Sequence, residues 1–467
     1  MAGLWCDDYN EVMRSVVPPP STKNSYSSSL AGDVSDGEEQ AARAEAREAR
    51  NFLVIALYQI VMRIGWIFKT ESIVMPAVLD SLGGAGWLRG CLPLLNRLGN
   101  SLAPLLFARR MKIMRRKKWA LAACMALMSA VFLALSGLWF ATGGVATAWM
   151  RASFLLLYTA FFICIGIHQL ALGTLQGKLI HAVHRGRLML FSNVIGSIAA
   201  IVCAWYLLRQ WLTPDTADFR LIFLFSGAAF AVCVGVSLLL SEPADHYRQA
   251  RSPLRHLFSD VRRTMREDAN FRRLMGVAAL FGSSIMLFPH YQALGRDVLG
   301  ISLDAIILWV VVQNAGTGAF SLVAGPLADR CGNRLVLRVS VLAICVCPLA
   351  ALWCGALGET GKAWYWAVFV LVGLTPITIR TLMNYTLEVA EPAEHPRYLS
   401  ALSLSLAAPI FFSPLMGLLV DVAGFAPVFL GVTVLVFGGW LLTFSLAEPR
   451  HHLPESPDAA VSDEAAC

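Results

Sequence analysis

The sequence predicts an all-α membrane protein with twelve transmembrane helices arranged as two six-helix bundles. Two observations lead to this fold class. The chain is 57% hydrophobic and only 15% charged, whereas soluble globular proteins carry about 25% charged residues. Apolar runs, each close to the ~20 residues that a helix needs to cross a bilayer, also follow one another along most of the chain.

The apolar runs fall into two sets of six, separated by an arginine-rich stretch. We expect a first bundle over residues 51–240, a cytoplasmic linker over 241–271 and a second bundle over 272–447. The polar segments 1–50 and 448–467 are expected to be disordered cytoplasmic tails, with a charged surface helix over 37–50 as the alternative for part of the first. The helices are expected near 52–80, 85–108, 118–141, 152–177, 187–210, 219–240, 272–296, 303–326, 334–355, 364–390, 399–421 and 424–446.

Basic residues are concentrated in every second loop. Residues 109–118 and 248–266 are rich in arginine and lysine, whereas the alternate loops, such as 83–86, carry few. Cytoplasmic loops of membrane proteins are enriched in these two residues. Both termini are therefore expected in the cytoplasm, in a multi-pass protein of the cell's inner membrane. The net charge of +7 reflects this topology, so nucleic acid is not an expected partner.

A polar decapeptide, Gly325–Arg334, separates the eighth and ninth apolar runs. Its glycines permit a tight turn, and Asp329 can accept hydrogen bonds from backbone amides or from an arginine. A sharp polar turn between two membrane helices would fix their relative positions. We therefore expect a gating role for Gly325, Asp329, Arg330, Gly332 and Arg334.

The decapeptide resembles the signature loop of the major facilitator superfamily, which joins the second and third helices of each six-helix half. The corresponding first-half loop, Ala103–Arg110, has Phe107 in place of the aspartate and Arg110 in place of the second glycine. The resemblance covers residues 51–447. It implies two bundles that rock about a central site, which is then open to one side of the membrane at a time.

Polar side chains inside the apolar runs are the candidates for the substrate site, because burying them in lipid is costly. In the first helix, Arg63 lies near the membrane midplane, on a polar stripe of the helix. Lys69 points away from that stripe, lies nearer the outer surface and is expected to snorkel. In the tenth, Arg380 leads a polar face. The expected substrate-binding residues are Arg63, Thr70, Glu71, His168, Gln169, His290, Gln313, Asn314, Arg380 and Asn384.

These candidates carry more positive than negative charge. Arg63 and Arg380 are permanent cations, His168 and His290 can titrate near neutral pH, and Glu71 is the one clear acid. Excess positive charge favours an anionic organic substrate with a carboxylate or phosphate group. Glu71 is the candidate for coupling transport to protons. For every candidate, the alternative is a structural hydrogen bond between helices.

The sequence thus predicts a secondary active transporter of a small solute, working by alternating access as a proton symporter or antiporter. Its expected partners are the substrate, protons and the lipid bilayer, and it is expected to act as a monomer. No enzyme, cofactor or metal site is predicted, because His181-x-x-His184 and His451–His452 lack further ligands and no phosphate-binding loop is present. Two alternatives stay open: an uncoupled facilitator or exchanger, and a non-transporting receptor or assembly factor with a carrier fold.

Overall fold

The structure is a computed structural model. Met1–Ala49 and Arg50–Cys467 are separate units, and the bundles lie in the second of them. Most of the described residues are helical, and none of them belongs to a β-strand. They are 30–213, 218–245, 265–266, 268–390 and 394–448.

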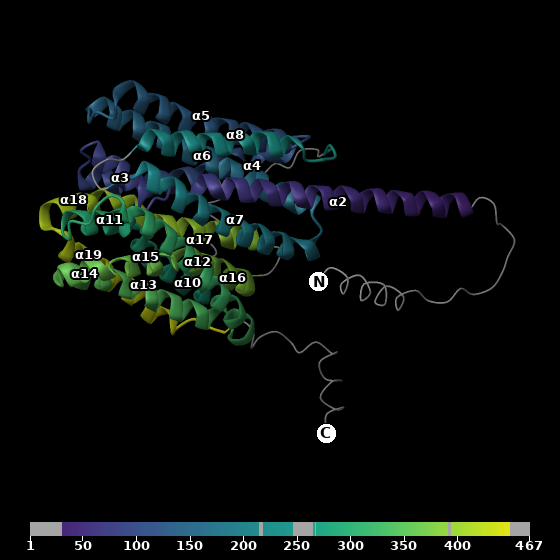
Figure 1. The fold of residues 1–467 in the computed structure, drawn as a ribbon. Helices are drawn as coiled ribbons and strands as arrows, with labels where there is room; N and C mark the ends of the chain where they lie inside the picture. The colour runs from purple at the N-terminus through teal and green to yellow at the C-terminus, as the bar shows by residue number, and fades with distance from the viewer. Residues whose placement is uncertain (1–29, 214–217, 246–264, 267, 391–393, 449–467) are drawn as a thin grey trace. The chain divides into compact units, whose positions relative to one another are not determined.

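The first bundle contains the helices that precede the linker. Figure 1 shows α5, α6 and α8 side by side, and aromatic rings of these helices, such as Phe132, Phe161 and Phe230, pack against one another in the bundle core. The helices are α2 (Leu30–Ile67), α3 (Val74–Ser81), α4 (Gly86–Ile113), α5 (Lys118–Thr142), α6 (Ala148–Leu179), α7 (Ala182–Trp211) and α8 (Phe219–Leu238).

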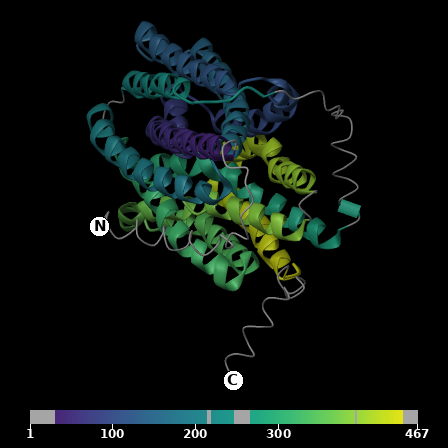
Figure 2. The same cartoon turned by 90° about the vertical axis from the view of Figure 1, so that its right-hand side faces the viewer.

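The second bundle follows the linker and occupies the green-to-yellow part of Figures 1 and 2. Helix α13 packs against α19, and α10 packs against both α19 and α17. The elements are α10 (Ala269–Gly282), η1 (Ser283–Leu287), α11 (Phe288–Asp297), α12 (Ala305–Cys331), α13 (Asn333–Ala356), α14 (Glu359–Trp364), α15 (Trp366–Val372), α16 (Thr375–Val389), α17 (His395–Ala407), η2 (Ala408–Phe412), α18 (Ser413–Ala423) and α19 (Phe425–Thr443).

Eleven helical segments among the described residues are long and apolar enough to cross a membrane. The remaining expected span is α4, which has the length of a membrane helix but is interrupted by polar residues such as Arg89 and Arg97. Helix α4 packs against α6 in its own bundle and against α18 in the other, so it lies among the spanning helices. The predicted fold class, an all-α membrane protein with two six-helix bundles, is confirmed.

Several predicted helices are broken. The first ends at Ile67 and resumes at Val74, where the side-chain oxygen of Thr70 accepts a hydrogen bond from the Val74 amide at 3.3 Å. The seventh, tenth and eleventh helices break beside prolines, because proline lacks an amide hydrogen and clashes with the preceding turn. The prolines at these breaks are Pro289, Pro376, Pro409 and Pro414.

The first helix begins earlier than expected. Helix α2 starts at Leu30, so residues 30–50 are helical where a disordered tail was expected. Alanine, glutamate and arginine dominate residues 38–50, and all three favour helix. The remaining expected tail residues and most of the linker lie outside the described part of the chain.

The predicted turn at Gly325–Arg334 is shorter than the decapeptide. Helix α12 continues through Gly325 to Cys331, and α13 begins at Asn333, so only Gly332 lies between them. Gly332 has φ +83°, a conformation that favours glycine. A side chain there would also approach Glu448, because an added Cβ would lie 2.8 Å from its Oε1 atom.

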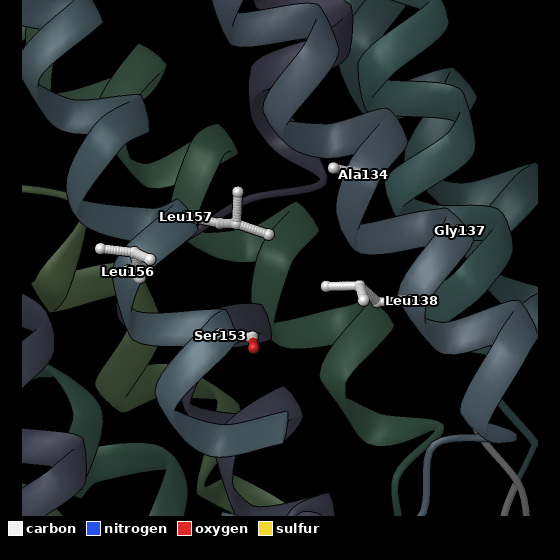
Figure 3. Close-up of a pocket in the computed structure, with 6 residues that line it drawn as sticks. All are labelled: Ala134, Gly137, Leu138, Ser153, Leu156 and Leu157. Carbon is white, nitrogen blue, oxygen red and sulfur yellow. The ribbon is translucent and has the colours of Figure 1, made fainter. Parts of the chain in front are cut away.

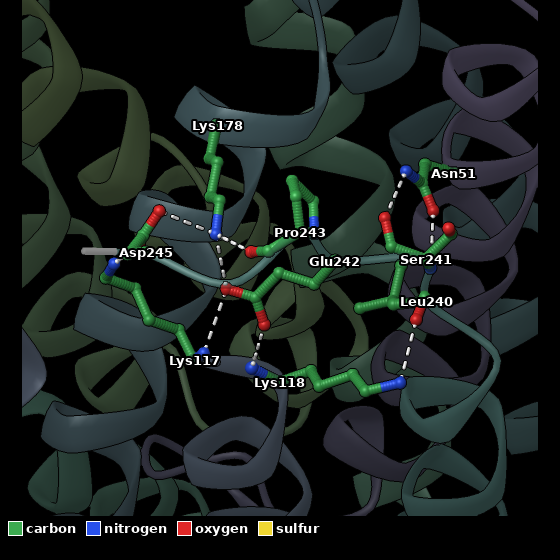
Figure 4. A network of polar contacts seen from close by, with 9 residues as sticks. All are labelled: Asn51, Lys117, Lys118, Lys178, Leu240, Ser241, Glu242, Pro243 and Asp245. Atoms are coloured by element: carbon green, nitrogen blue, oxygen red, sulfur yellow. Dashed lines mark hydrogen bonds and ion pairs between the residues drawn. The ribbon is translucent and has the colours of Figure 1, made fainter. Parts of the chain in front are cut away.

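A buried glutamate anchors the linker end of the first bundle, by which we mean the end where Ser241–Asp245 lie. The Glu242 carboxylate accepts hydrogen bonds from the backbone amides of Lys117 (2.9 Å) and Lys118 (2.8 Å) and from Nζ of Lys178 at 3.0 Å (Figure 4). Asp245 pairs with Lys117 and Lys178. Hydrogen bonds from these two lysines hold the pKa of the Asp245 carboxyl below its usual range.

The second bundle has a corresponding anchor. Glu448 follows α19 as Glu242 follows α8, and each glutamate precedes a proline. Glu448 pairs with Nε of Arg334, at the start of α13, over 2.9 Å. In both bundles, an acidic residue after the last helix therefore binds the start of the third spanning helix.

Candidate functional site

The two bundles meet along α4, which packs against α17 and α18, and along α7, which packs against α12. Every hydrogen bond and ion pair that the structure describes between the bundles uses a residue within 72–97. These residues lie toward the end opposite the linker, which carries the turns at Gly83 and Gly300 and is called the far end below. The described polar contacts therefore join the bundles toward the far end.

Small residues bring α4 and α18 into close contact at the far end. A Cβ atom added to Gly86 or Gly90 would clash with the backbone of α18 near Gly417 and Ser413, and one added to Gly417 would clash with the Gly86 carbonyl. Asp421 of α18 completes the contact by accepting hydrogen bonds from the first amides of α4. This crossing resembles the small-residue packing of membrane helices, in which backbones approach closely.

Arg89 adds a charged contact beside the crossing. Its guanidinium pairs with Asp80 of α3 in the same bundle and, over 3.4 Å, with Asp297 of α11 in the other bundle. The Arg89 side chain is 11% exposed, whereas that of Asp297 is 49% exposed. The ion pair thus spans the interface from a mostly buried arginine to a half-exposed aspartate.

Nearer the middle of the molecule, Arg63 of α2 and Arg380 of α16 belong to opposite bundles and lie within electrostatic range of each other. The charge of Arg380 acts on Arg63, so the two guanidinium groups repel each other. Arg63 donates from Nη1 to the side-chain oxygen of Asn193 at 3.1 Å, and its buried Nε has no partner. Arg380 is exposed and has no hydrogen-bond or ion-pair partner among the described residues. The one described polar contact to this pair of cations is a neutral amide.

Glu71 does not neutralise these arginines. It pairs with Lys69 at 3.0 Å and accepts a hydrogen bond from Asn96. Lys69 is 1% exposed and lies over the rings of Trp66 (3.9 Å to the centroid) and Phe162 (4.2 Å). The expectation that Lys69 snorkels is therefore wrong. The break after Ile67 redirects the chain and turns Lys69 into the bundle.

The other expected substrate residues are divided between exposed and buried positions. Gln169 and Asn384 are exposed, whereas His168 is buried and its Nε2 lies 2.7 Å from the Tyr58 hydroxyl. Gln313 accepts a hydrogen bond from Ser72 of the other bundle at 2.6 Å. Asn314 donates to the Val310 carbonyl, the Thr70 side chain bonds within its own turn, and His290 is fully buried. Substrate-binding roles for all of these residues stay predictions.

The expected gating residues lie at the linker end of the second bundle. Arg330 is exposed, Arg334 pairs with Glu448, and the Asp329 side chain lies outside the described part of the structure. Asn333, beside Gly332, donates to Glu388 of α16 at 2.8 Å. This side chain ties α13 to the helix that carries Arg380. The gating role of the group stays a prediction.

Sequence reasoning missed Asn193, the partner of Arg63, and Asp421, which caps α4. Asn193 follows Ser192 inside the fifth apolar run, and Asp421 is the single acid of the eleventh. Polar residues isolated within apolar runs were therefore a usable signal for both. The signal identifies neither partner, because the partners come from distant parts of the chain.

A shallow groove between α5 and α6 is unsuited to a charged solute (Figure 3). Its lining is apolar apart from one serine hydroxyl, and Leu156 is 72% exposed. Such a surface suits contact with lipid chains. The lining residues are Ala134, Gly137, Leu138, Ser153, Leu156 and Leu157.

Comparisons with known proteins find one matching family profile and several solved transporter structures with a similar fold. Residues 274–463 match the sequence profile of the Major Facilitator Superfamily. A mutant of the nucleoside transporter NupG matches the fold with a TM-score of 0.68 and 12% identity, over 85% of this chain and 100% of that chain. A POT family transporter in complex with 5-aminolevulinic acid matches with a TM-score of 0.66 and 12% identity, over 86% and 97%.

A bacterial homologue of the human lysosomal transporter Spinster, solved in an inward-facing and unoccupied conformation, has a TM-score of 0.58 and 13% identity, over 86% of this chain and 98% of that one. No curated protein sequence matches the chain. At these identities, the solved structures show the fold alone. The second bundle thus matches the Major Facilitator Superfamily in sequence, and the chain as a whole has the fold of these solved transporters.

Proposed function

We propose that the protein is a proton-coupled secondary transporter that carries a small organic anion by alternating access. The observation that supports the anionic substrate is the pair formed by Arg63 and Arg380, which repel each other across the bundle interface. Glu71, the one acid among the expected substrate residues, is already paired with Lys69. Repulsion between two cations that lack an acid partner is unfavourable, and a carboxylate or phosphate bound between them would offset it.

The geometry also fits a two-sided mechanism. Arg63 belongs to the first bundle and Arg380 to the second, so an anion bound to both would be held by both moving parts. The exposure of Arg380 and Asn384 and the polar contacts toward the far end favour a state that is open toward the linker end. We place the protein in the inner membrane of the cell, with the linker end and both termini in the cytoplasm. The basic loops lie at the linker end, and basic loops are typical of the cytoplasmic side.

One chain supplies both arginines, which supports a monomeric transporter. Proton coupling through Glu71 requires that this carboxylate leave Lys69 during the cycle. An uncoupled exchanger would share the same arginine pair and would differ in its response to a proton gradient. Transport in proteoliposomes with and without such a gradient separates these two possibilities.

The first test is a thermal-shift screen of the purified protein with organic anions, cations, sugars and amino acids. A bound ligand stabilises the folded protein by about 2.7 kcal/mol at a hundredfold excess over Kd. We expect anions to raise the melting temperature and the Arg63→Gln and Arg380→Gln variants to lose that shift. Arg209→Gln, which removes an exposed arginine near the far end of α7, is the matched control and should keep it.

Two results would contradict the proposal. Stabilisation by sugars or cations alone would preserve the carrier fold but exclude an anion site between the arginines. An anion shift that survives in both arginine variants would place the binding site elsewhere. A well-folded protein that binds no solute in the panel would favour a receptor or assembly factor.

A further inference from the structure

His290 occupies an unusual position at the far end. It is 0% exposed, and neither ring nitrogen has a hydrogen-bond partner among the described residues. It belongs to α11, which packs against α3 and α4 of the other bundle. Most buried polar groups in proteins have a partner. A fully buried imidazole without one, next to the interface between the bundles, therefore requires an explanation.

Arg89 of α4 is the charged residue that acts electrostatically on His290. Arg89 already holds both acids of this region, Asp80 of α3 and Asp297 of α11. Arg296 of α11 adds a second positive charge that acts on Asp80.

Helix α11 also packs against η1 and α13. Three aromatic residues of other elements contact it as well, namely Trp309 of α12, Tyr365 between α14 and α15, and Phe429 of α19. The described residues of η1 include no titratable group. Helix α13 contributes the thiols Cys347 and Cys354, of which Cys347 lies beside Tyr291. None of these contacting residues is an acid. The acids of α3, α4 and α11 are Asp80 and Asp297, and both are paired with Arg89.

We infer that proton binding at His290 controls the opening of the far end. In the closed arrangement, a protonated ring would carry a buried positive charge beside Arg89, with no acid of its own. The charge can be accommodated if Asp80 or Asp297 turns from Arg89 to His290, or if the bundles separate and admit water. If Asp297 pairs with His290 instead of Arg89, the described ion pair between α4 and α11 is lost.

Closure of the far end and proton binding at His290 therefore oppose each other. By linkage, a proton that favours the open state is itself bound more tightly in that state. Acid on the far side would hold that end open, and the proton would have to leave before the end closes. This inference rests on the proposed alternating-access function, and it assigns the proton-sensitive step to a residue distinct from the arginine pair.

Hydrogen–deuterium exchange of the purified protein tests this without any substrate. Exchange is compared at about pH 5.5 and pH 7.5, on either side of the ordinary histidine pKa of about 6.5, after correction for the chemical exchange rate. We expect peptides covering residues 86–92 and 288–297 to exchange severalfold faster at the acidic pH. His290→Gln should remove this response, whereas His395→Gln, at the linker end, should retain it.

The exchange experiment can contradict the inference in two ways. A wild-type protein with no pH response at the far end, or a His290→Gln variant that keeps the response, would overturn the inference. If His290→Gln fails to fold, Asp297→Asn provides the test, because its side chain is half-exposed. That variant should exchange rapidly at both pH values, and wild-type behaviour would again overturn the inference. None of these results depends on anion binding, so the arginine pair is tested independently.

Discussion

The carboxylate of Asp421 accepts a hydrogen bond from the backbone amide of Gly86 at 2.9 Å, so a residue of the second bundle caps a helix of the first. The same carboxylate accepts from the Trp87 amide at 3.3 Å. The first amides of a helix lack partners within that helix, and the helix dipole there favours negative charge. In the proposed transport cycle, the cap would form and break each time the far end closes and opens.

Removing the cap should favour opening of the far end. Loss of a capping side chain costs about 1 kcal/mol, so Asp421→Ala should increase the open population about fivefold. Hydrogen–deuterium exchange of residues 288–297, which Asp421 does not cap, should be faster in the variant. Asp304→Ala is the matched control, because Asp304 precedes α12 without capping it through its side chain. Equal exchange in both variants would show that the Asp421 cap does not help to keep the far end closed.

A larger residue at Gly417 should disturb the closed crossing. A methyl group there clashes with the Gly86 carbonyl, and overpacking typically costs about 1–3 kcal/mol. Gly417→Ala should lower the melting temperature or speed exchange at the far end. Gly235→Ala, on α8 with open space around it, should be neutral or stabilising by up to about 1 kcal/mol. Unchanged melting and unchanged exchange in Gly417→Ala would show that the crossing is not tight.

The Lys69–Glu71 pair should behave as one unit. Removing one partner of a buried pair leaves an uncompensated charge and costs about 3–5 kcal/mol. Glu71→Gln should therefore lower the melting temperature strongly, because Lys69 is 1% exposed. The double variant Lys69→Met with Glu71→Gln should recover most of the loss. A double variant that melts as low as the single one would show that Glu71 acts on stability through another partner.

Asp245 should make the folded protein sensitive to acid. Hydrogen bonds from Lys117 and then Lys178 hold its pKa in the folded protein below the ordinary value of 3.8. Its contribution is fully present above that value and is lost as pH falls through the lower folded pKa, because the unfolded chain binds the proton more readily. Melting temperatures measured at decreasing pH should fall less steeply in Asp245→Asn. The same steepness as wild type would refute this assignment.

The sequence was sufficient for the fold because apolar run length and loop charge are local properties that survive tertiary packing. The break after Ile67 was not predicted, since no proline marks it. Assuming a continuous helix put Lys69 on the wrong side of that helix. The sequence predicted only that Arg63 and Arg380 contribute to the same substrate site. The distance between them depends on how the two bundles pack together, which the sequence does not reveal.

The far-end contacts were harder to foresee. Arg89 and Asp80 lie near helix ends, where charged residues commonly indicate topology and little else. Their role depends on Asp297, more than two hundred residues away along the chain. A partner at that sequence distance cannot be identified from spacing on one helix.

Helix α4 has a consequence for biosynthesis. It is too polar to count among the eleven apolar spans, and Arg97 donates to the Ser403 carbonyl at 2.8 Å. That acceptor is synthesised some three hundred residues later. Arg97 of α4 therefore gains this partner only after most of the second bundle has been translated. Stable insertion of α4 thus depends on packing within the assembled chain and not on the hydrophobicity of α4 alone.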